Sequence, residues 1–316
     1  MRARLLHRVA LATLAIAVTV PSVAEAQIPP YITQWGTYGT APGQFRGPGG
    51  MAVDASGYIY VADSNNNRIQ KFTSDGTYVT QWGAQGAGPG QLSLPNGVAV
   101  DASGNVYVIE IGNRRVQKFT NGGSYIAQWG GMYLSQGIAV DGNGNVYVAD
   151  GLRIAKFTST GTLLTQWGGF NNATCVAVDG SGNVYVADSG ISGFHIDRIE
   201  KFTDTGAYIT AWGTSGSGDG QFNTTWGIAV DSAGDVYVDD YFGERIVKYS
   251  GTGSSLGQWG TSGTGAGQFN HPYGITTDPA GNIYVSEDPN SRVQKFGPVP
   301  TPTKATSWGR LKRMYR

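Results

Sequence analysis

The sequence is poor in cysteine and histidine. Cys175 is the single cysteine, so no disulfide can form within the chain. Beyond residue 26, histidine occurs only at His195 and His271, which is too few for a three-histidine zinc site. Stability must therefore come from burying a large apolar core, which a chain of 316 residues is long enough to build.

Basic residues are scarce between the two ends of the chain. Residues 27–303 contain 14 lysines and arginines against 21 aspartates and glutamates. Binding to nucleic acid requires a basic surface, so we expect no nucleic-acid partner. Residues 298–316 are rich in proline and threonine and then basic. We expect a flexible tail there, or alternatively a segment that attaches the protein to a surface or to lipid.

Long apolar runs are absent except at the N-terminus. There "MRARLLHR" precedes the apolar run "VALATLAIAVTV", and "AEA" follows at residues 24–26. This order is typical of a secretory signal peptide, so we expect residues 1–26 to be removed. The run is too short to span a bilayer well, and we predict no membrane span. We expect the protein to be secreted, periplasmic or on the cell surface.

Glycine is abundant, with 49 residues, and the glycines punctuate a repeated unit. A run similar to "GIAVD" occurs six times, each time followed by runs similar to "NVYVAD" and "RIQKF". Five of the six units continue with a run similar to "YITQWG". We number repeats one to six by the aspartate that ends the first run: Asp54, Asp101, Asp141, Asp179, Asp231 and Asp278.

Each repeat predicts four short antiparallel strands. The first run is nearly all small and apolar, as in a strand buried on both faces, and the next two alternate apolar and polar residues. Turn clusters such as "DASGN" and "TSDGT" favour tight hairpins rather than calcium loops, which need several carboxylates. One such sheet cannot bury both its faces, whereas sheets stacked around an axis can. We therefore predict an all-β fold, a six-bladed β-propeller over residues 27–297.

The sixth repeat lacks its fourth strand. We expect residues 31–36, "YITQWG", to supply it, which would join the N-terminal strand to the last blade and remove an open sheet edge. The second candidate for this strand is "ATSWG", residues 305–309, whose spacing fits the repeat less well.

The pattern "GIAVD…GNVYVADS…NRIQKF…G.Y.TQWG" resembles the NHL repeat over residues 31–296, nearly the whole chain after the leader. The resemblance implies a six-bladed propeller and a bacterial, secreted protein. It implies little about activity, because propellers of this family serve as sensor domains of receptor kinases, as protein- or RNA-binding scaffolds, and as lyases or hydrolases.

An acidic residue ends the second strand of every repeat, and an arginine begins the third. A catalytic group is needed once, whereas this pair occurs six times. We therefore interpret the pair as a structural contact that ties the second strand to the third. The predicted pairs are Asp63–Arg68, Glu110–Arg115, Asp150–Arg153, Asp188–Arg198, Asp240–Arg245 and Glu287–Arg292.

The repeats differ in the loop before the first strand. From the tryptophan of "QWG" to the aspartate that ends the next first strand, the spacing is 19 residues in repeats one, two, five and six, and 12 in repeats three and four. We predict one face of the propeller that is built up over four blades and notched over two. The loop "SGISGFHID" of repeat four, residues 189–197, overhangs the notch and carries His195.

The first residue of each first strand varies among the repeats and lies at the mouth of the predicted axis: Gly49, Asn96, Gln136, Thr174, Trp226 and Tyr273. Propeller pockets lie at this mouth, so this variable ring is where ligand specificity would be encoded. The alternative is that these side chains only plug the channel. We predict the following ligand contacts: Trp226, Tyr273, His271, His195, Asn96 and Gln136.

These observations predict a non-catalytic binding module that acts as a monomer, has no cofactor or metal, and binds a protein, peptide or glycan. The alternative is a propeller lyase or a lactonase-type hydrolase with a divalent cation in the axial channel. Propellers that resemble streptogramin lyases use a histidine with an acid and magnesium. His271 and Glu287 match that arrangement only loosely.

Overall fold

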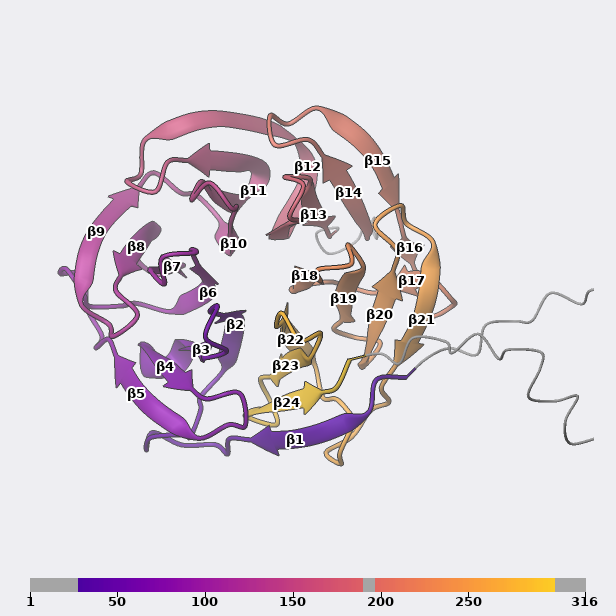
Figure 1. Ribbon diagram of the computed structural model, residues 1–316, viewed down its shortest axis with the longest axis horizontal. Coiled ribbons are helices and arrows are strands. Elements are labelled where there is room, and N and C mark those ends of the chain that lie inside the picture. The colour runs from indigo at the N-terminus through magenta and orange to yellow at the C-terminus, as the bar shows by residue number, and fades with distance from the viewer. Residues whose placement is uncertain (1–27, 190–196, 299–316) are drawn as a thin grey trace, which may run out of the picture.

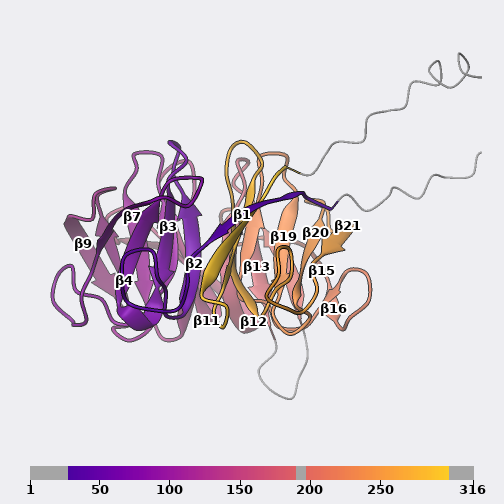
Figure 2. The same cartoon turned by 90° about the horizontal axis from the view of Figure 1, so that it is seen from below.

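The computed structural model describes residues 28–189 and 197–298. Short strands form antiparallel sheets that radiate from a central axis, with the first strand of each repeat innermost (Figure 1). Seen from the side, the ring of sheets is a flat disc (Figure 2). The expected all-β propeller with four-stranded antiparallel blades is therefore confirmed. The predicted signal peptide, His195 and the tail beyond residue 298 lie outside the described residues.

Repeats one, two, five and six each form a separate four-stranded sheet. Repeat one gives β2 (Pro48–Val53), β3 (Ile59–Asp63), β4 (Arg68–Phe72) and β5 (Tyr78–Trp82). Repeat two gives β6 (Pro95–Val100), β7 (Val106–Glu110), β8 (Arg115–Phe119) and β9 (Tyr125–Gly130). Repeat five gives β18 (Ile228–Val230), β19 (Val236–Asp240), β20 (Arg245–Tyr249) and β21 (Ser255–Trp259). Repeat six gives β22 (Pro272–Thr277), β23 (Ile283–Glu287) and β24 (Arg292–Phe296).

The N-terminal strand completes the sheet of repeat six. β1 (Tyr31–Trp35) pairs antiparallel with β24, with Trp35 opposite Val293, and Figure 1 shows the two ends of the described chain side by side. The prediction that residues 31–36 close the ring is therefore confirmed. The rival segment 305–309 lies outside the described residues.

Repeats three and four differ from the prediction, because they share one six-stranded sheet. Its strands are β10 (Ser135–Val140), β11 (Val146–Phe157), β12 (Leu163–Val178), β13 (Val184–Asp188), β14 (Arg198–Phe202) and β15 (Tyr208–Trp212). β11 contains two predicted strands of repeat three, and β12 contains the last strand of repeat three and the first of repeat four. The short connections cause this continuity: the turn at Gly151 is tight, with φ of 63°, and the long loop of the other repeats is missing.

The core lies between neighbouring sheets rather than within one. Ile109 and Val116 of repeat two pack with Val146 and Val148 of repeat three in one buried cluster. The tryptophans of the "QWG" runs bridge sheets in the same way: the ring of Trp82 lies 6.0 Å from Tyr60 and 6.0 Å from Phe119 of the next repeat. Each sheet thus packs one face against the sheet before it and the other face against the sheet after it. This packing holds the sheets in place around the axis.

The remaining elements are small, and all lie in loops. A 3-10 turn, η1 (Ser64–Asn66), joins β3 to β4, and a two-residue parallel ladder pairs β16 (Thr214–Ser215) with β17 (Gln221–Phe222). Within the described residues, no helix is long and apolar enough to cross a membrane.

The aspartate that ends the first strand of each repeat makes local hydrogen bonds in the hairpin turn. In repeat one, Oδ1 of Asp54 accepts the N–H groups of Ser56 and Tyr58, and Oδ2 accepts the hydroxyl of the buried Tyr60 at 2.8 Å. The same tyrosine–aspartate bond recurs in the other five repeats. These carboxylates therefore shape turns and hold a buried tyrosine.

Candidate functional site

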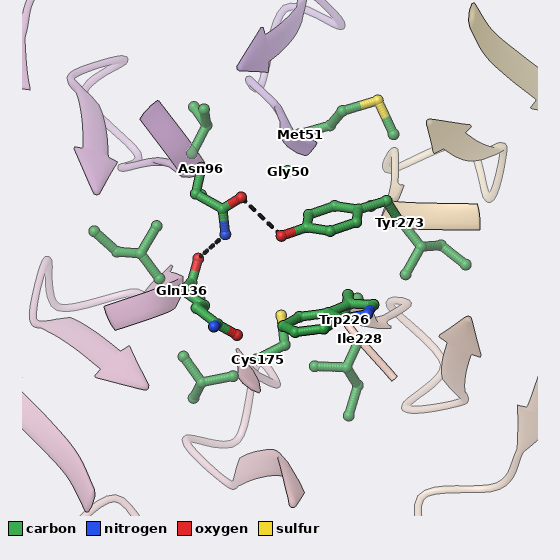
Figure 3. A pocket seen from close by; sticks show the side chains of 16 residues that line it. Gly50, Met51, Asn96, Gln136, Cys175, Trp226, Ile228 and Tyr273 are labelled. Atoms are coloured by element: carbon green, nitrogen blue, oxygen red, sulfur yellow. Dashed lines mark hydrogen bonds between the residues drawn. The ribbon is translucent and has the colours of Figure 1, made fainter. Parts of the chain in front are cut away.

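The innermost strands surround a small cavity of about 50 Å³ on the axis (Figure 3). Asn96, Gln136, Trp226 and Tyr273, four of the six ring positions singled out in the sequence, line it. At the other two positions, the neighbours Gly50 and Cys175 line the cavity instead. The sequence therefore located this mouth through its variable residues.

Irregular strand starts turn these side chains toward the axis. The pairing of β6 with β7 shifts register between Pro95 and Gly97, which leaves Asn96 as a bulge, and the shift between Pro272 and Gly274 does the same for Tyr273. A bulge re-aims the side chain of the extra residue. The repeated Gly that follows permits close approach of neighbouring backbones: a Cβ at Gly97 would lie 2.8 Å from the Gln136 carbonyl oxygen.

Hydrogen bonds and stacking close the channel at this level (Figure 3). The Tyr273 hydroxyl donates to Oδ1 of Asn96 at 2.9 Å, and Nδ2 of Asn96 donates to the Gln136 carbonyl at 2.9 Å. The Tyr273 ring stacks on Trp226 with centroids 5.6 Å apart and planes within 8°. A cavity of about 50 Å³ holds only a few water molecules, so in this conformation these side chains plug the axis.

The cysteine in this cavity is not a reactive thiol. Desolvation raises the pKa of Cys175 to about 12. The thiolate is the nucleophilic form of cysteine, and at neutral pH such a group is almost wholly protonated. Cys175 therefore acts as a small apolar residue in the wall, as its place in a "GIAVD"-like run predicts.

A buried carboxyl group lies behind Trp226. Oδ1 of Asp239 accepts the N–H of Trp226 at 2.9 Å and that of Gly227 at 3.0 Å, and Oδ2 has no hydrogen-bond partner among the described residues. Desolvation raises the pKa of Asp239 well above its ordinary value, so the group is neutral over a wider pH range than a surface aspartate. The corresponding residues of the other repeats are Ala62, Ile109, Ala149, Ala187 and Ser286.

An aromatic cluster rises from the mouth over repeats five and six. Its residues are Trp226, Tyr241, Phe242, His271 and Tyr273. Tyr241 is central: its ring centroid lies 4.5 Å from that of His271, 5.0 Å from Phe242 and 6.4 Å from Trp226. At the outer end, Phe242 is 59% exposed. The structure therefore brings the predicted His271 to Trp226 and Tyr273 through Tyr241, and places it outside the axial cavity.

Sequence reasoning missed Asp239, Tyr241 and Phe242. All three stand in "VYVDDYFGER", where the repeat has one acid and a polar or small loop, as in "VYVADSNNNR" of repeat one. The second acidic residue and the two aromatic residues distinguish this repeat from the others, and that difference could have identified them as candidate site residues. Trp226 was predicted to begin the first strand of repeat five, but β18 begins at Ile228.

Acidic groups surround the aromatic cluster. Oε2 of Glu244 accepts the backbone N–H of His271 at 2.9 Å, and Oε1 lies 4.0 Å from Nδ1 of that imidazole. Burial raises the pKa of Tyr241, and the negative charges of Asp288 and Glu244 add to the effect. The field at the cluster therefore favours a positive charge.

The positive φ of His271, 51°, belongs to the scaffold rather than to the cluster. The same loop position has φ of 64° at Gly47, 48° at Leu94 and 63° at Thr224. A left-handed residue here is thus required by the long loop of repeats one, two, five and six, whatever the side chain. It carries no separate functional meaning.

The six acid–arginine pairs are all in contact. The shortest N–O distances are 2.7 Å for Asp63–Arg68, 2.6 Å for Glu110–Arg115, 2.9 Å for Asp150–Arg153, 3.3 Å for Asp188–Arg198, 2.7 Å for Asp240–Arg245 and 2.6 Å for Glu287–Arg292. The acids are fully buried. In repeats one, two, five and six the arginine also donates to carbonyl oxygens of the long loop. These contacts fit the interpretation that the pairs are structural.

The residues loosely matched to a lyase site are not arranged as one. Glu287 accepts hydrogen bonds from Arg292, Gln294 and Asn290, so its carboxylate is already engaged. Within the part of the chain that the structure describes, no group of three or more His, Cys, Asp or Glu residues is placed to hold a metal ion.

Comparison with known proteins identifies the repeat. The NHL repeat matches residues 45–72, 92–119 and 269–296. The B-box type zinc finger protein ncl-1 of Caenorhabditis elegans and Protein brain tumor of Drosophila melanogaster are each 48% identical over 46 residues, which is 15% of this chain. The aligned segment covers only 5% and 4% of those proteins, respectively.

Solved structures share the architecture at low identity. A Bacteroides thetaiotaomicron protein of unknown function has a TM-score of 0.67 at 18% identity, covering 84% of this chain and 76% of its own. A gluconolactonase, XC5397 of Xanthomonas campestris, has 0.64 at 17%, covering 86% and 95%. A streptogramin B lyase has 0.60 at 15%, covering 86% and 99%. At these identities the likeness shows the fold alone.

Proposed function

Because the chain belongs to the NHL-repeat family, we propose that it is a secreted, non-catalytic binding module on a six-bladed propeller. Repeats three and four count as two blades in this proposal, because each contributes an innermost strand, β10 and the second half of β12. The binding surface is the aromatic cluster at the mouth of the axis.

One observation carries this proposal: the cluster breaks the repeat and is open to solvent. Scaffold residues such as Glu110 and Arg115 are buried and bonded to one another. The cluster instead exposes Phe242 beside the half-buried His271. Aromatic side chains at the rim of a hollow are the usual anchors of protein and peptide ligands, because they bury a large area at little cost in conformational entropy.

The charge around the cluster supports a ligand with a basic side chain. Glu244 and Asp288 flank the rings, and acidic residues outnumber basic ones, 21 to 14, in residues 27–303. A lysine or arginine of the ligand would meet both the faces of aromatic rings and carboxylates. We propose a protein or peptide segment of this kind as the partner, which is a narrower class than protein, peptide or glycan.

Binding to an array of short peptides tests the proposal. We expect peptides with a central lysine or arginine to bind the full chain, and Phe242→Ala to weaken that binding at least tenfold, because the exposed anchor is lost. The matched control is Tyr133→Ala, since Tyr133 is 70% exposed and belongs to repeat three.

Two results would overturn it: wild-type binding to no peptide of the array, or equal binding by the Phe242→Ala and wild-type proteins. Preference for glycans, probed on a parallel glycan array, would also count against a basic peptide. Thermal melts of each variant establish that the compared proteins are folded.

The second candidate function is a propeller lyase or lactonase-type hydrolase with a divalent cation in the axial channel. The fold likeness to a streptogramin B lyase and a gluconolactonase favours it. The residues present do not fit the cation: at the cavity the side-chain oxygens are those of Asn96, Gln136 and Tyr273, none of them a carboxylate, and the Asn96 oxygen already accepts a hydrogen bond from Tyr273. Calcium takes six to eight oxygens, usually with several carboxylates. A thermal shift on chelation would restore this candidate.

A further inference from the structure

A second and larger hollow, of about 330 Å³, lies between repeats one and six. It is formed by the loop before β2, by η1 between β3 and β4, and by the loop that joins β23 to β24. Its volume falls within the range of small-molecule sites, in contrast to the axial cavity of about 50 Å³. The lining residues are Tyr38, Arg46, Gly47, Asn65, Asp288, Pro289 and Ser291.

One wall of this groove carries a cation without an anionic partner. Among the described residues, no carboxylate lies within 4.0 Å of the Arg46 guanidinium, which is held 5.2 Å above the Tyr38 ring. The backbone of Arg46 is fixed, because its N–H donates to the buried Asp63 at 2.8 Å. The exposed guanidinium thus offers its planar set of donors from a fixed backbone position.

The facing loop carries a carboxylate that forms no ion pair within 4.0 Å among the described residues. The Asp288 side chain also has no side-chain hydrogen bond there; desolvation raises its pKa, and the charge of the nearby His271 opposes that rise. The carboxylate reaches the floor of the groove: a Cβ at Gly47 would lie 3.3 Å from Oδ1 of Asp288 and 2.6 Å from Nδ2 of Asn65. A carboxyl and an amide therefore converge where glycine leaves room.

Neither charge belongs to the repeated scaffold. The position of Arg46 is Ser93, Asn223 or Asn270 in the other long-loop repeats, and the position of Asp288 is Ser64, Ile111 or Tyr241. The propeller therefore folds without these two charges elsewhere in the ring. Here a positively charged and a negatively charged residue, each absent from the other long-loop repeats, line the same hollow.

We propose that this groove binds a small zwitterion of the amino-acid class. The carboxylate of the ligand pairs with Arg46, since guanidinium and carboxylate form parallel hydrogen bonds, and its ammonium pairs with Asp288. Tyr38 covers the ligand at the rim. The groove shares Asp288 with the acidic surroundings of the aromatic cluster, whereas Tyr38, Arg46 and Asn65 lie outside that cluster. Loss of amino-acid binding in Arg46→Gln therefore tests the groove separately from the proposed function.

Calorimetric titration of the full chain with free α-, β- and γ-amino acids tests the proposal. We expect saturable binding of at least one of them. Arg46→Gln and Asp288→Asn should each weaken it at least tenfold, because each leaves one ligand charge unpaired. The matched control is Arg114→Gln: Arg114 lies over Tyr133 at 5.8 Å, outside the groove, and its loss should leave the affinity unchanged.

Blocked ligands separate a zwitterion from a simple ion. The N-acetyl form lacks the ammonium and the amide form lacks the carboxylate, and both should lose binding. A dipeptide carries its two charges farther apart, so binding of the dipeptide in preference to free amino acids would identify a peptide as the source. Undiminished binding of either blocked form, no binding of any amino acid, or wild-type affinity in both groove variants would overturn the proposal.

Discussion

Repeats two and three carry the same ion pair in different surroundings. In repeat two, Arg115 is bonded to Glu110 and also donates to three carbonyl oxygens of the long loop, and its side chain is 9% exposed. In repeat three the loop is short, and Arg153 is bonded to Asp150 with its side chain 37% exposed. One motif in the sequence is thus two different contacts in the structure.

The difference shows what the arginine does. Where the long loop is present, the guanidinium is the polar centre on which the loop folds, and every donor faces a protein acceptor. Where the loop is missing, the guanidinium of Arg153 is partly exposed and donates to Oε1 of Gln166 and to the Gly131 carbonyl. The pair therefore joins the second strand to the third in every repeat, and it organises the long loop only in repeats one, two, five and six.

The largest effect is expected from removing the buried arginine. Arg115→Ala leaves the buried Glu110 and three loop carbonyls without their donor, and breaking a buried ion pair in this way costs about 3–5 kcal/mol of unfolding free energy. Arg153→Ala should cost less, because the Arg153 side chain is partly exposed and the buried Asp150 keeps the backbone N–H groups of Tyr133 and Leu134 as donors. Urea unfolding of both variants measures the contrast.

Equal losses in the two variants would break the comparison, since they would show that the loop contacts add nothing to the pair. Proteolysis sharpens it further. Cleavage in the loop of residues 83–94 should accelerate in Arg115→Ala, while the Arg153→Ala protein serves as the control.

A smaller effect is expected at the glutamine that assists this arginine. Oε1 of Gln117 accepts the Gly90 N–H, and Nε2 donates to Glu110 and to the Gln91 carbonyl. Repeat five keeps the long loop with Val247 at this position. Gln117→Val should therefore fold, with a loss of about 1–3 kcal/mol for buried groups left unpaired. No loss by urea unfolding would mean that arginine alone holds the loop.

The fold could be predicted because the same pattern of apolar residues recurs in every repeat. Six copies of the same apolar spacing specify buried inner strands, and the spare "YITQWG" run specified β1 as the closing strand. The residues at the mouth of the axis could be predicted because they differ among repeats that are otherwise alike. Trp226 and Tyr273 vary where the scaffold repeats, and both line the cavity.

The side-chain contacts of the candidate site and the merging of two sheets could not be predicted, because the repeat pattern does not determine how loops direct their side chains. Whether Tyr241 meets His271 is set by two loops from different repeats, and the bulge at Tyr273 turns that side chain away from simple alternation. The merging of repeats three and four depends on the missing long loop, which lets β12 run from repeat three into repeat four. These features arise from loop geometry, so a single sequence could indicate the region and not the contacts.

At the axis, repeat five differs from repeat two through Asp239. Ile109 fills the equivalent place in repeat two, and there β6 runs from Pro95. In repeat five the carboxyl accepts the N–H groups of Trp226 and Gly227, and β18 begins only at Ile228. The side chain thus substitutes for strand pairing and holds the backbone of the aromatic cluster.

The smallest effect, expected from Asp239→Asn, tests this role through pH. Asparagine keeps an acceptor for both N–H groups and cannot ionise, so the variant should fold with little change in acid. Burial raises the pKa of Asp239, so the folded protein retains a proton that the unfolded chain releases above about pH 4. The wild type should therefore lose stability relative to the variant as pH rises from about 4 toward the raised folded value, and then level off. Urea unfolding from pH 4 to 8 measures the difference, and parallel stability curves for the two proteins would show that Asp239 does not hold its proton.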